Sequence, residues 1–426
     1  MLNYAIRTLW NRRRLYVPAA VVLFGGLTLV LAFVGLLASS RSAANPDDQQ
    51  FLLMFPAILG SWVLAISMFA IASTVSVVML ARAGEFDTLR RLGATGTQIR
   101  QLICLETAVV GTIVAIPAAA AGTVLGSIIF ARLHTIGMVD TATDYSPGIV
   151  MTSVATGCLV AISGVAAQFG SRQTASQHDS MRRRRVAAAL VLAVGMGSST
   201  AAFAVEPDGA AATATAGPGT VLVAIGLALL TREMLGAVCR ACTLFFKKSG
   251  VSGYLATINA IAVEGARPTA MFLTLFVGVS VGTLTMQHLE DSSAGVGTEG
   301  QLMASINYSV VGLVAAFMAI ALINNLVASI GRRSGEFGVM YRIGATSGQT
   351  VGMLMLETAV AVLAAGTVGT IGAVLAVVPY AYVKSGSPLA ALSPTIALAV
   401  LAVGTVLAMG VTFAAGRRTI NSVVGP

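Results

Sequence analysis

The sequence predicts an all-α polytopic membrane protein with about ten transmembrane helices. Of its 426 residues, 56% are hydrophobic and only 10% are charged, whereas soluble domains carry about 25% charged residues. Apolar runs recur along the whole chain, and about 20 such residues in a helix cross the ~30 Å of bilayer hydrocarbon. The low charge argues against disorder, and the 45 glycines follow no three-residue period that would indicate collagen.

Ten segments are long and apolar enough to be spans. In chain order they are 16–38, 53–80, 103–130, 149–170, 186–205, 218–235, 269–287, 307–330, 352–382 and 394–416. The first is longer than the ~7–15 residues of a signal-peptide apolar region, so we interpret it as a membrane span. The fifth and sixth are short and separated by a loop of small residues, which leaves an eight-span topology open as an alternative.

Basic residues fall on one side of this topology. With the N-terminus inside, all but three of the 26 Lys and Arg residues lie in inside segments, and the exceptions are Arg41, Arg132 and Lys384. The positive-inside rule therefore places both termini in the cytoplasm. No basic domain interleaved with aromatic residues lies outside the spans, so the net charge of +9 indicates membrane topology, and we expect no nucleic-acid partner.

A motif occurs twice at an offset of 251 residues. Gly84-Glu85-Phe86 recurs as Gly335-Glu336-Phe337, and 13 of the 26 positions from 84 to 109 are identical to their counterparts. The matched residues include Arg91, Gly93, Ala94, Thr95 and Glu106 in the first copy, and Arg342, Gly344, Ala345, Thr346 and Glu357 in the second.

Both copies lie on the inside, which indicates a parallel repeat of two four-helix units with two inserted helices. We therefore expect a first repeat over 1–170, a two-span insert with an amphipathic linker over 171–268, and a second repeat over 269–426. Each copy is expected to form a short helix under the membrane. A Glu near its start suits the positive helix N-terminus, and Gly-Ala-Thr supplies a turn into the next span.

The arrangement R-x-G-E-F…R-(L/I)-G-A-T…L-E between the second and third spans of a four-span unit resembles the FtsX/MacB-like ABC permease family. In its ten-span form the chain is similar to bacitracin-resistance-type permeases, but it lacks their large extracytoplasmic domain. The resemblance implies a bacterial plasma-membrane location and a separate ABC ATPase, in two copies, that docks on these loops. The implied ATPase-coupling residues are Glu85, Phe86, Arg91, Gly93, Ala94 and Thr95, with Glu336, Phe337, Arg342, Gly344, Ala345 and Thr346 in the second copy.

The chain itself is expected to be a non-catalytic subunit without a cofactor. It contains no Gly-Lys dipeptide and therefore no Walker A motif, so ATP and Mg are expected on the partner ATPase. No catalytic residues are predicted. Cys239 and Cys242 form a lone C-x-x-C pair without a second pair or a nearby His, so no metal site is expected.

Polar residues inside the spans are the remaining candidates. Glu106 and Glu357 lie about six residues into spans three and nine; each either bonds to a neighbouring helix or an Arg, or contributes to transmission or a substrate path. Ser73, Thr74, Asn324 and Asn325 occupy equivalent positions in spans two and eight, where they either bond between helices or line the same path.

The expected function is the permease subunit of an ABC transporter that exports or extracts an amphipathic or lipid-like substrate, since the outer loops 39–52 and 288–306 are short. The alternative is a mechanotransmitting or signalling protein that is driven by an ATPase but moves no substrate. An ion-coupled secondary transporter is disfavoured, because no charged residue lies near the middle of any predicted span.

Overall fold

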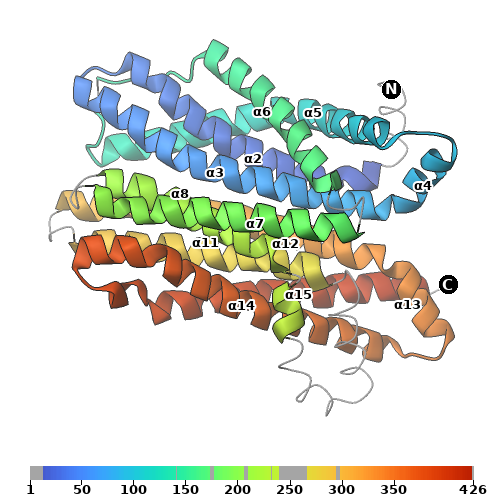
Figure 1. Cartoon of the computed structure of the whole chain (residues 1–426). Helices are drawn as coiled ribbons and strands as arrows, with labels where there is room; N and C mark the ends of the chain where they lie inside the picture. The colour runs from blue at the N-terminus through green and yellow to red at the C-terminus, as the bar shows by residue number, and fades with distance from the viewer. Residues whose placement is uncertain are drawn as a thin grey trace. The chain divides into compact units, whose positions relative to one another are not determined.

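The described part of the chain is entirely helical apart from short connections (Figure 1). The computed structural model describes residues 13–140, 142–172, 177–205, 210–231, 233–238, 266–293 and 298–424, and no strand occurs among them. The long helices are α2 (Arg13–Ser39), α3 (Pro46–Ala81), α5 (Gly96–Thr135), α6 (Ile149–Arg172), α7 (Gln177–Thr200), α8 (Ala210–Leu229), α11 (Ala266–Ser293), α12 (Thr298–Arg332), α14 (Ser347–Ser385) and α15 (Pro394–Val424). The all-α polytopic class is confirmed.

Eight of these helices are long and apolar enough to cross a membrane within the described residues: α2, α3, α5, α7, α11, α12, α14 and α15. The apolar parts of α6 and α8 that are described, Ile149–Gly164 and Thr215–Leu229, are shorter. The predicted fifth span thus meets the criterion, while the fourth and sixth fall short of it in the described residues.

The chain divides into two compact units. Unit 1 comprises 1–180 and 287–317, and unit 2 comprises 181–286 and 318–426. In unit 1, α2 packs against α3 and α5, and α6 packs against the same two helices; in unit 2, α14 packs against α8 and α15. These units do not have the boundaries of the expected repeats and insert, 1–170, 171–268 and 269–426. That division into repeats and insert stays a prediction.

Two short helices lie at matched places in the units: α4 (Ala83–Arg91) joins α3 to α5, and α13 (Ser334–Arg342) joins α12 to α14. Figure 1 shows each of them as a short helix at the ends of the long helices that it connects. They are the short helices that the repeated motif predicts.

Glycine allows α5 to lie directly on α2. A Cβ atom placed on Gly122 would stand 2.9 Å from the carbonyl oxygen of Thr28 and 2.9 Å from Cβ of Leu31. Gly278 on α11 is similarly close to α8, where the same atom would lie 2.9 Å from Cβ of Ala224. Small residues of this kind let helix backbones approach in a membrane, where packing replaces the hydrophobic effect as the cause of association.

The far end of unit 1, away from α4, is tied together by one buried carboxylate. Oδ2 of Asp48, at the start of α3, accepts hydrogen bonds from the Thr143 hydroxyl at 2.8 Å and the Asp140 backbone N–H at 3.0 Å. The Thr143 Oγ1 in turn accepts from the backbone N–H of Ala44 at 3.0 Å. The connection before α3 and the connection after α5 therefore form one short polar cap.

Replacing Gly122 with Ala is expected to destabilise unit 1. The new methyl group cannot avoid the Thr28 carbonyl, and overpacking of this kind costs about 1–3 kcal/mol. Gly157→Ala on α6 is the matched control, because no atom lies within 4 Å of the added Cβ. Thermal unfolding in one detergent should show a lower midpoint for Gly122→Ala alone. Equal midpoints would contradict the close α2–α5 contact.

Candidate functional site

The short helices α4 and α13 end in the same way. Gly93 and Gly344, which follow their last turns, have φ values of +94° and +95°, a conformation that favours glycine. The Gly93 N–H bonds to the Arg90 carbonyl and the Ala94 N–H bonds to the Leu89 carbonyl. The Gly344 region repeats both bonds. This is the Schellman arrangement, which stops a helix and satisfies its last carbonyls.

The next helix begins immediately with a capping box. Thr95 caps α5: its hydroxyl accepts from the Gln98 N–H at 3.3 Å, while the Gln98 side chain accepts from the Thr95 N–H at 2.9 Å. Thr346 and Gln349 make the same pair of bonds at the start of α14. The predicted Gly-Ala-Thr turn is thus a helix stop followed by a helix start.

These two caps hold an apolar side chain outward at the tip of each turn. Leu92 and Ile343 occupy equivalent positions, and each is 79% exposed. Arg91, Gly93 and Thr95 are exposed beside Leu92, and Ala94 is half-buried. In the second copy Arg342, Gly344 and Thr346 are exposed and Ala345 is half-buried. We call Leu92 and Ile343 with these neighbours the two tips.

The Glu-Phe pair that both copies share lies on the opposite face of each short helix. Phe86 and Phe337 are buried, and their rings lie 5.1 Å and 5.5 Å from the guanidinium carbons of Arg82 and Arg333. Glu85 and Glu336 are half-buried. These four residues therefore point toward the protein, and of the predicted coupling residues only those at the tips face outward.

Arg82 joins α4 to the membrane helix α5. Its side chain is 1% exposed; Nε lies 3.0 Å from Glu85 Oε2 and a terminal nitrogen lies 2.5 Å from Glu106 Oε2. Glu106 is fully buried on the third turn of α5. A carboxylate in this position is costly unless it is paired and hydrogen-bonded, and the arginine supplies both.

Tyr16 of α2 completes this cluster. Its hydroxyl donates to Glu106 Oε2 at 2.6 Å and accepts from the Arg82 guanidinium at 2.5 Å. The same oxygen of Glu106 is therefore bound by both Tyr16 and Arg82. Three helices, α2, α4 and α5, meet at one guanidinium group.

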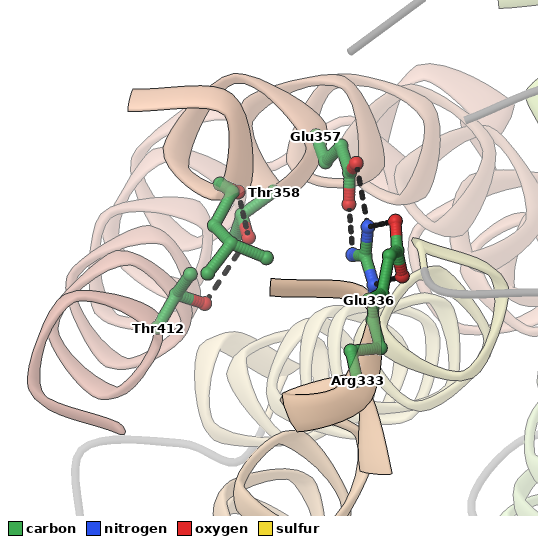
Figure 2. Close-up of polar contacts among 6 residues, drawn as sticks. Arg333, Glu336, Glu357, Thr358 and Thr412 are labelled. Atoms are coloured by element: carbon green, nitrogen blue, oxygen red, sulfur yellow. Dashed lines mark hydrogen bonds and ion pairs between the residues drawn. The ribbon is translucent and has the colours of Figure 1, made fainter. Parts of the chain in front are cut away.

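Arg333 makes the equivalent junction in unit 2. Figure 2 shows its guanidinium between the carboxylates of Glu336 and Glu357. Two nitrogens bond to Glu336 at 2.8 and 3.0 Å, and two bond to Glu357 at 2.5 and 3.2 Å. Burial by itself lowers the pKa of Arg333, but the hydrogen bonds and charges of the two glutamates raise it above its ordinary value. Arg333 therefore stays protonated and holds both carboxylates.

Unit 1 has a feature of its own beside Glu106. A cavity of about 10 Å³, which is room for roughly one water molecule, is lined in part by Glu106, Tyr16, Thr107 and Ile103. The second carboxylate oxygen of Glu106 has no hydrogen-bond partner among the described residues. In unit 2 the residue after Glu357, Thr358, instead bonds to Thr412 of α15 at 3.1 Å (Figure 2).

Thr74, Asn324 and Asn325 are the other predicted polar residues whose side chains the structure describes. Thr74 donates to the Ala70 carbonyl of its own helix at 2.8 Å, and its expected bond to another helix stays a prediction. The Ser73 side chain lies outside the described residues. Asn324 is half-buried, and Asn325 is fully buried with neither side-chain polar atom bonded among the described residues.

Arg82, Arg333, Tyr16, Leu92 and Ile343 were not predicted as site residues. The signal for the arginines was present, since both belong to the repeated R-x-G-E-F pattern. Leu92 and Ile343 stand inside the repeated turn but differ between the copies. Nothing in the sequence marks Tyr16.

Comparison with known protein families matches two segments of the chain. Residues 57–175 and 308–424 each match the family described as FtsX-like permease C-terminal. Together the segments cover more than half of the chain. The chain belongs to the FtsX-like permease family. The two matches confirm the repeat and include both arginine junctions of this permease, whereas Tyr16 precedes the first match.

One relative adds a weaker likeness. The permease is 30% identical over 84 residues to a protein of Bacillus subtilis (strain 168) named "Uncharacterized ABC transporter permease YknZ". That stretch is 20% of this chain and 21% of the relative, so the permease spans about a fifth of the length of the curated relative it matches.

In the described part of the permease, no three His, Cys, Asp or Glu side chains lie close enough together to hold a metal ion. Cys239, Cys242 and most of the predicted amphipathic linker lie outside the described residues.

Replacing Arg82 with Ala is expected to destabilise the permease by about 3–5 kcal/mol, because removal of one partner leaves a buried charge uncompensated. The control is Arg100→Ala on the first turns of α5. Arg100 donates only to the Gly96 carbonyl and forms no ion pair among the described residues, so its loss should cost less than about 1 kcal/mol. Thermal unfolding of both variants in the same detergent measures the difference. Similar midpoints would show that the junction does not stabilise the fold.

Proposed function

We propose that this protein is the permease subunit of an ABC transporter, and that α4 and α13 are coupling helices that dock on a separate ABC ATPase. The observation that carries the proposal is the pair of tips. Leu92 and Ile343 are held outward at equivalent positions by two cap motifs each. A rigidly presented apolar side chain with polar neighbours is what a protein interface uses as an anchor.

With two coupling helices, one permease chain would offer one docking site to each of two ATPase copies. The sequence carries no Walker A motif, so ATP and Mg belong to the ATPase, and the permease is a non-catalytic subunit. The location we propose is a bacterial plasma membrane with both termini in the cytoplasm, which is supported by the excess of Lys and Arg in the segments that include α4 and α13. The ABC permease name of the Bacillus subtilis relative supports the same assignment.

The substrate we propose is amphipathic or lipid-like, exported or extracted from the bilayer. The connections at the predicted outer end are short: only Ser40–Asn45 separates α2 from α3, and the 3-10 helix η4 (Pro388–Ala391) lies between α14 and α15. The described part of the permease thus offers little protein outside the membrane to receive a water-soluble substrate, whereas apolar side chains such as Ile113 and Ile116 are widely exposed on α5.

Docking is tested by Leu92→Asp combined with Ile343→Asp. Two charges at the centres of the contacts should weaken ATPase binding by about 30-fold or more, which is the effect of losing an interface hot spot. Glu85 and Glu336 are unsuitable for this test because both are bound to the junction arginines. A mild-detergent pull-down with mass determination should give two ATPase copies per permease, and none with the variant.

The matched control is Leu389→Asp combined with Leu392→Asp, which alters two exposed leucines at the opposite end of α14. It should bind the ATPase as the unaltered permease does. If neither pair of substitutions changes binding, or no ATPase binds at all, the coupling-helix assignment is wrong.

Transport is tested by placing the purified complex in liposomes that contain a fluorescent phospholipid. MgATP should move the labelled lipid between leaflets, as measured by quenching of the outer leaflet, and the Leu92→Asp/Ile343→Asp variant should not. A complex that hydrolyses ATP but moves neither this lipid nor other amphipathic probes would favour the mechanotransmitting alternative.

A further inference from the structure

We propose that Arg82 and Arg333 are positioning residues that pass movement of α4 and α13 to the membrane helices, and that Tyr16 extends this connection to a third helix, α2, in unit 1. The inference rests on the proposed function, because α4 and α13 receive movement only if an ATPase docks on them. It concerns groups set back from the proposed ATPase surface, since the side chains of Arg82 and Arg333 are only 1% and 10% exposed, whereas the tips are exposed.

Each arginine occupies the hinge between a long helix and a short one. Arg82 is the single residue between α3 and α4, and Arg333 is the single residue between α12 and α13. Its side chain bonds forward to the first turn of the short helix and across to a carboxylate of the next membrane helix. The planar guanidinium fixes the directions of all these bonds at once.

Separation of the short helix from the membrane helix is costly. Glu106 is fully buried and Glu357 is nearly so, and each would become an unpaired charge if the arginine followed the short helix away. The low-energy response to a push on the tip is therefore movement of α4 with α5, and of α13 with α14. At the other end of each short helix, the helix stop and the capping box keep the connection to the same membrane helix only a few residues long.

Tyr16 adds a third helix to the junction of unit 1. Its hydroxyl ties α2 to Arg82 and Glu106. In unit 2, Arg333 bonds to Glu336 and Glu357 and lies beside the Phe337 ring. Movement of α4 should therefore displace α2 together with α5, and movement of α13 should be passed to α14 and, through Thr358 and Thr412, to α15.

Native sequence supplies matched probe positions. Cys104 lies two residues before Glu106, Met355 is its equivalent before Glu357, and both side chains are half-buried. Each variant carries one bimane fluorophore on a single cysteine. For the Cys104 probe the other three cysteines are replaced by Ser. For the Met355→Cys and Val17→Cys probes all four native cysteines are replaced by Ser. Val17 is exposed and adjacent to Tyr16 on α2. The readout is the change in emission on addition of MgATP to the permease–ATPase complex in lipid nanodiscs.

Arg82→Lys should reduce the MgATP response at Cys104 about tenfold, and Arg333→Lys should do the same at Met355→Cys, which is within the usual range of coupling between sites. Lysine keeps the charge that folding needs but cannot hold two carboxylates in a fixed fork. ATPase binding should stay within about twofold of the unaltered complex, because the tips are unchanged. Arg100→Lys is the control and should leave both responses intact.

Two further variants separate positioning from a general structural role. Arg333→Glu combined with Glu357→Arg keeps one cation between two carboxylates, and should restore the Met355→Cys response that Arg333→Lys loses. Tyr16→Phe should abolish the response at Val17→Cys, while that at Cys104 persists. Equal loss or equal retention at the two probes would overturn the assignment of Tyr16 as the connection to α2.

The outcomes distinguish this inference from the proposed function. Lysine variants that bind ATPase and respond to MgATP like the unaltered complex overturn the inference and leave the permease assignment standing. Lysine variants that lose ATPase binding also overturn it, since the arginines would then act in docking. An unaltered permease that binds no ATPase would instead contradict the proposed function itself.

Discussion

The fold around the candidate site depends on one interaction, a buried arginine that serves two carboxylates. Glu106 and Glu357 are buried, and a buried carboxylate without such a partner is costly to the fold. Because Arg82 and Arg333 sit at the hinges before α4 and α13, pairing fixes the start of each short helix against the next membrane helix. The Schellman turn and the capping box fix its end. A nine-residue helix, too short to be stable alone, is thereby held at both ends.

This arrangement divides the repeated motif between two tasks. The first half of the motif faces the protein: Glu85 and Phe86 pack on Arg82, and Glu336 and Phe337 pack on Arg333. The second half turns the chain and presents Leu92 and Ile343. A surface for a partner and a connection to the membrane helices are thus separated by only a few residues, which suits a segment that must both bind and transmit.

The two halves of the permease share this plan but differ in its surroundings. In unit 1 the junction includes Tyr16, and Glu106 is among the residues that line a cavity of about 10 Å³. In unit 2 the guanidinium is shared among four carboxylate bonds, and Thr358 continues the contact to α15. Both units therefore carry the same charged groups and the same phenylalanine, while the further contacts of each junction differ. Groups that neutralise a buried charge tolerate less change than apolar neighbours do.

The sequence by itself determined the all-α membrane class, the twofold repeat, and the stop and start of helices at Gly93-Ala94-Thr95. These features depend on apolar length and on bonds between residues a few positions apart, which a linear pattern records. Tertiary structure alone decided that Phe86 faces inward, that Thr74 bonds within its own helix, and which groups meet Arg82. Glu106 lies 24 residues from Arg82 and Tyr16 lies 66 away, so their meeting depends on how α2 and α5 pack. In the sequence Arg82 is explained equally well by membrane topology, and only its burial reveals that it is an ion-pair partner.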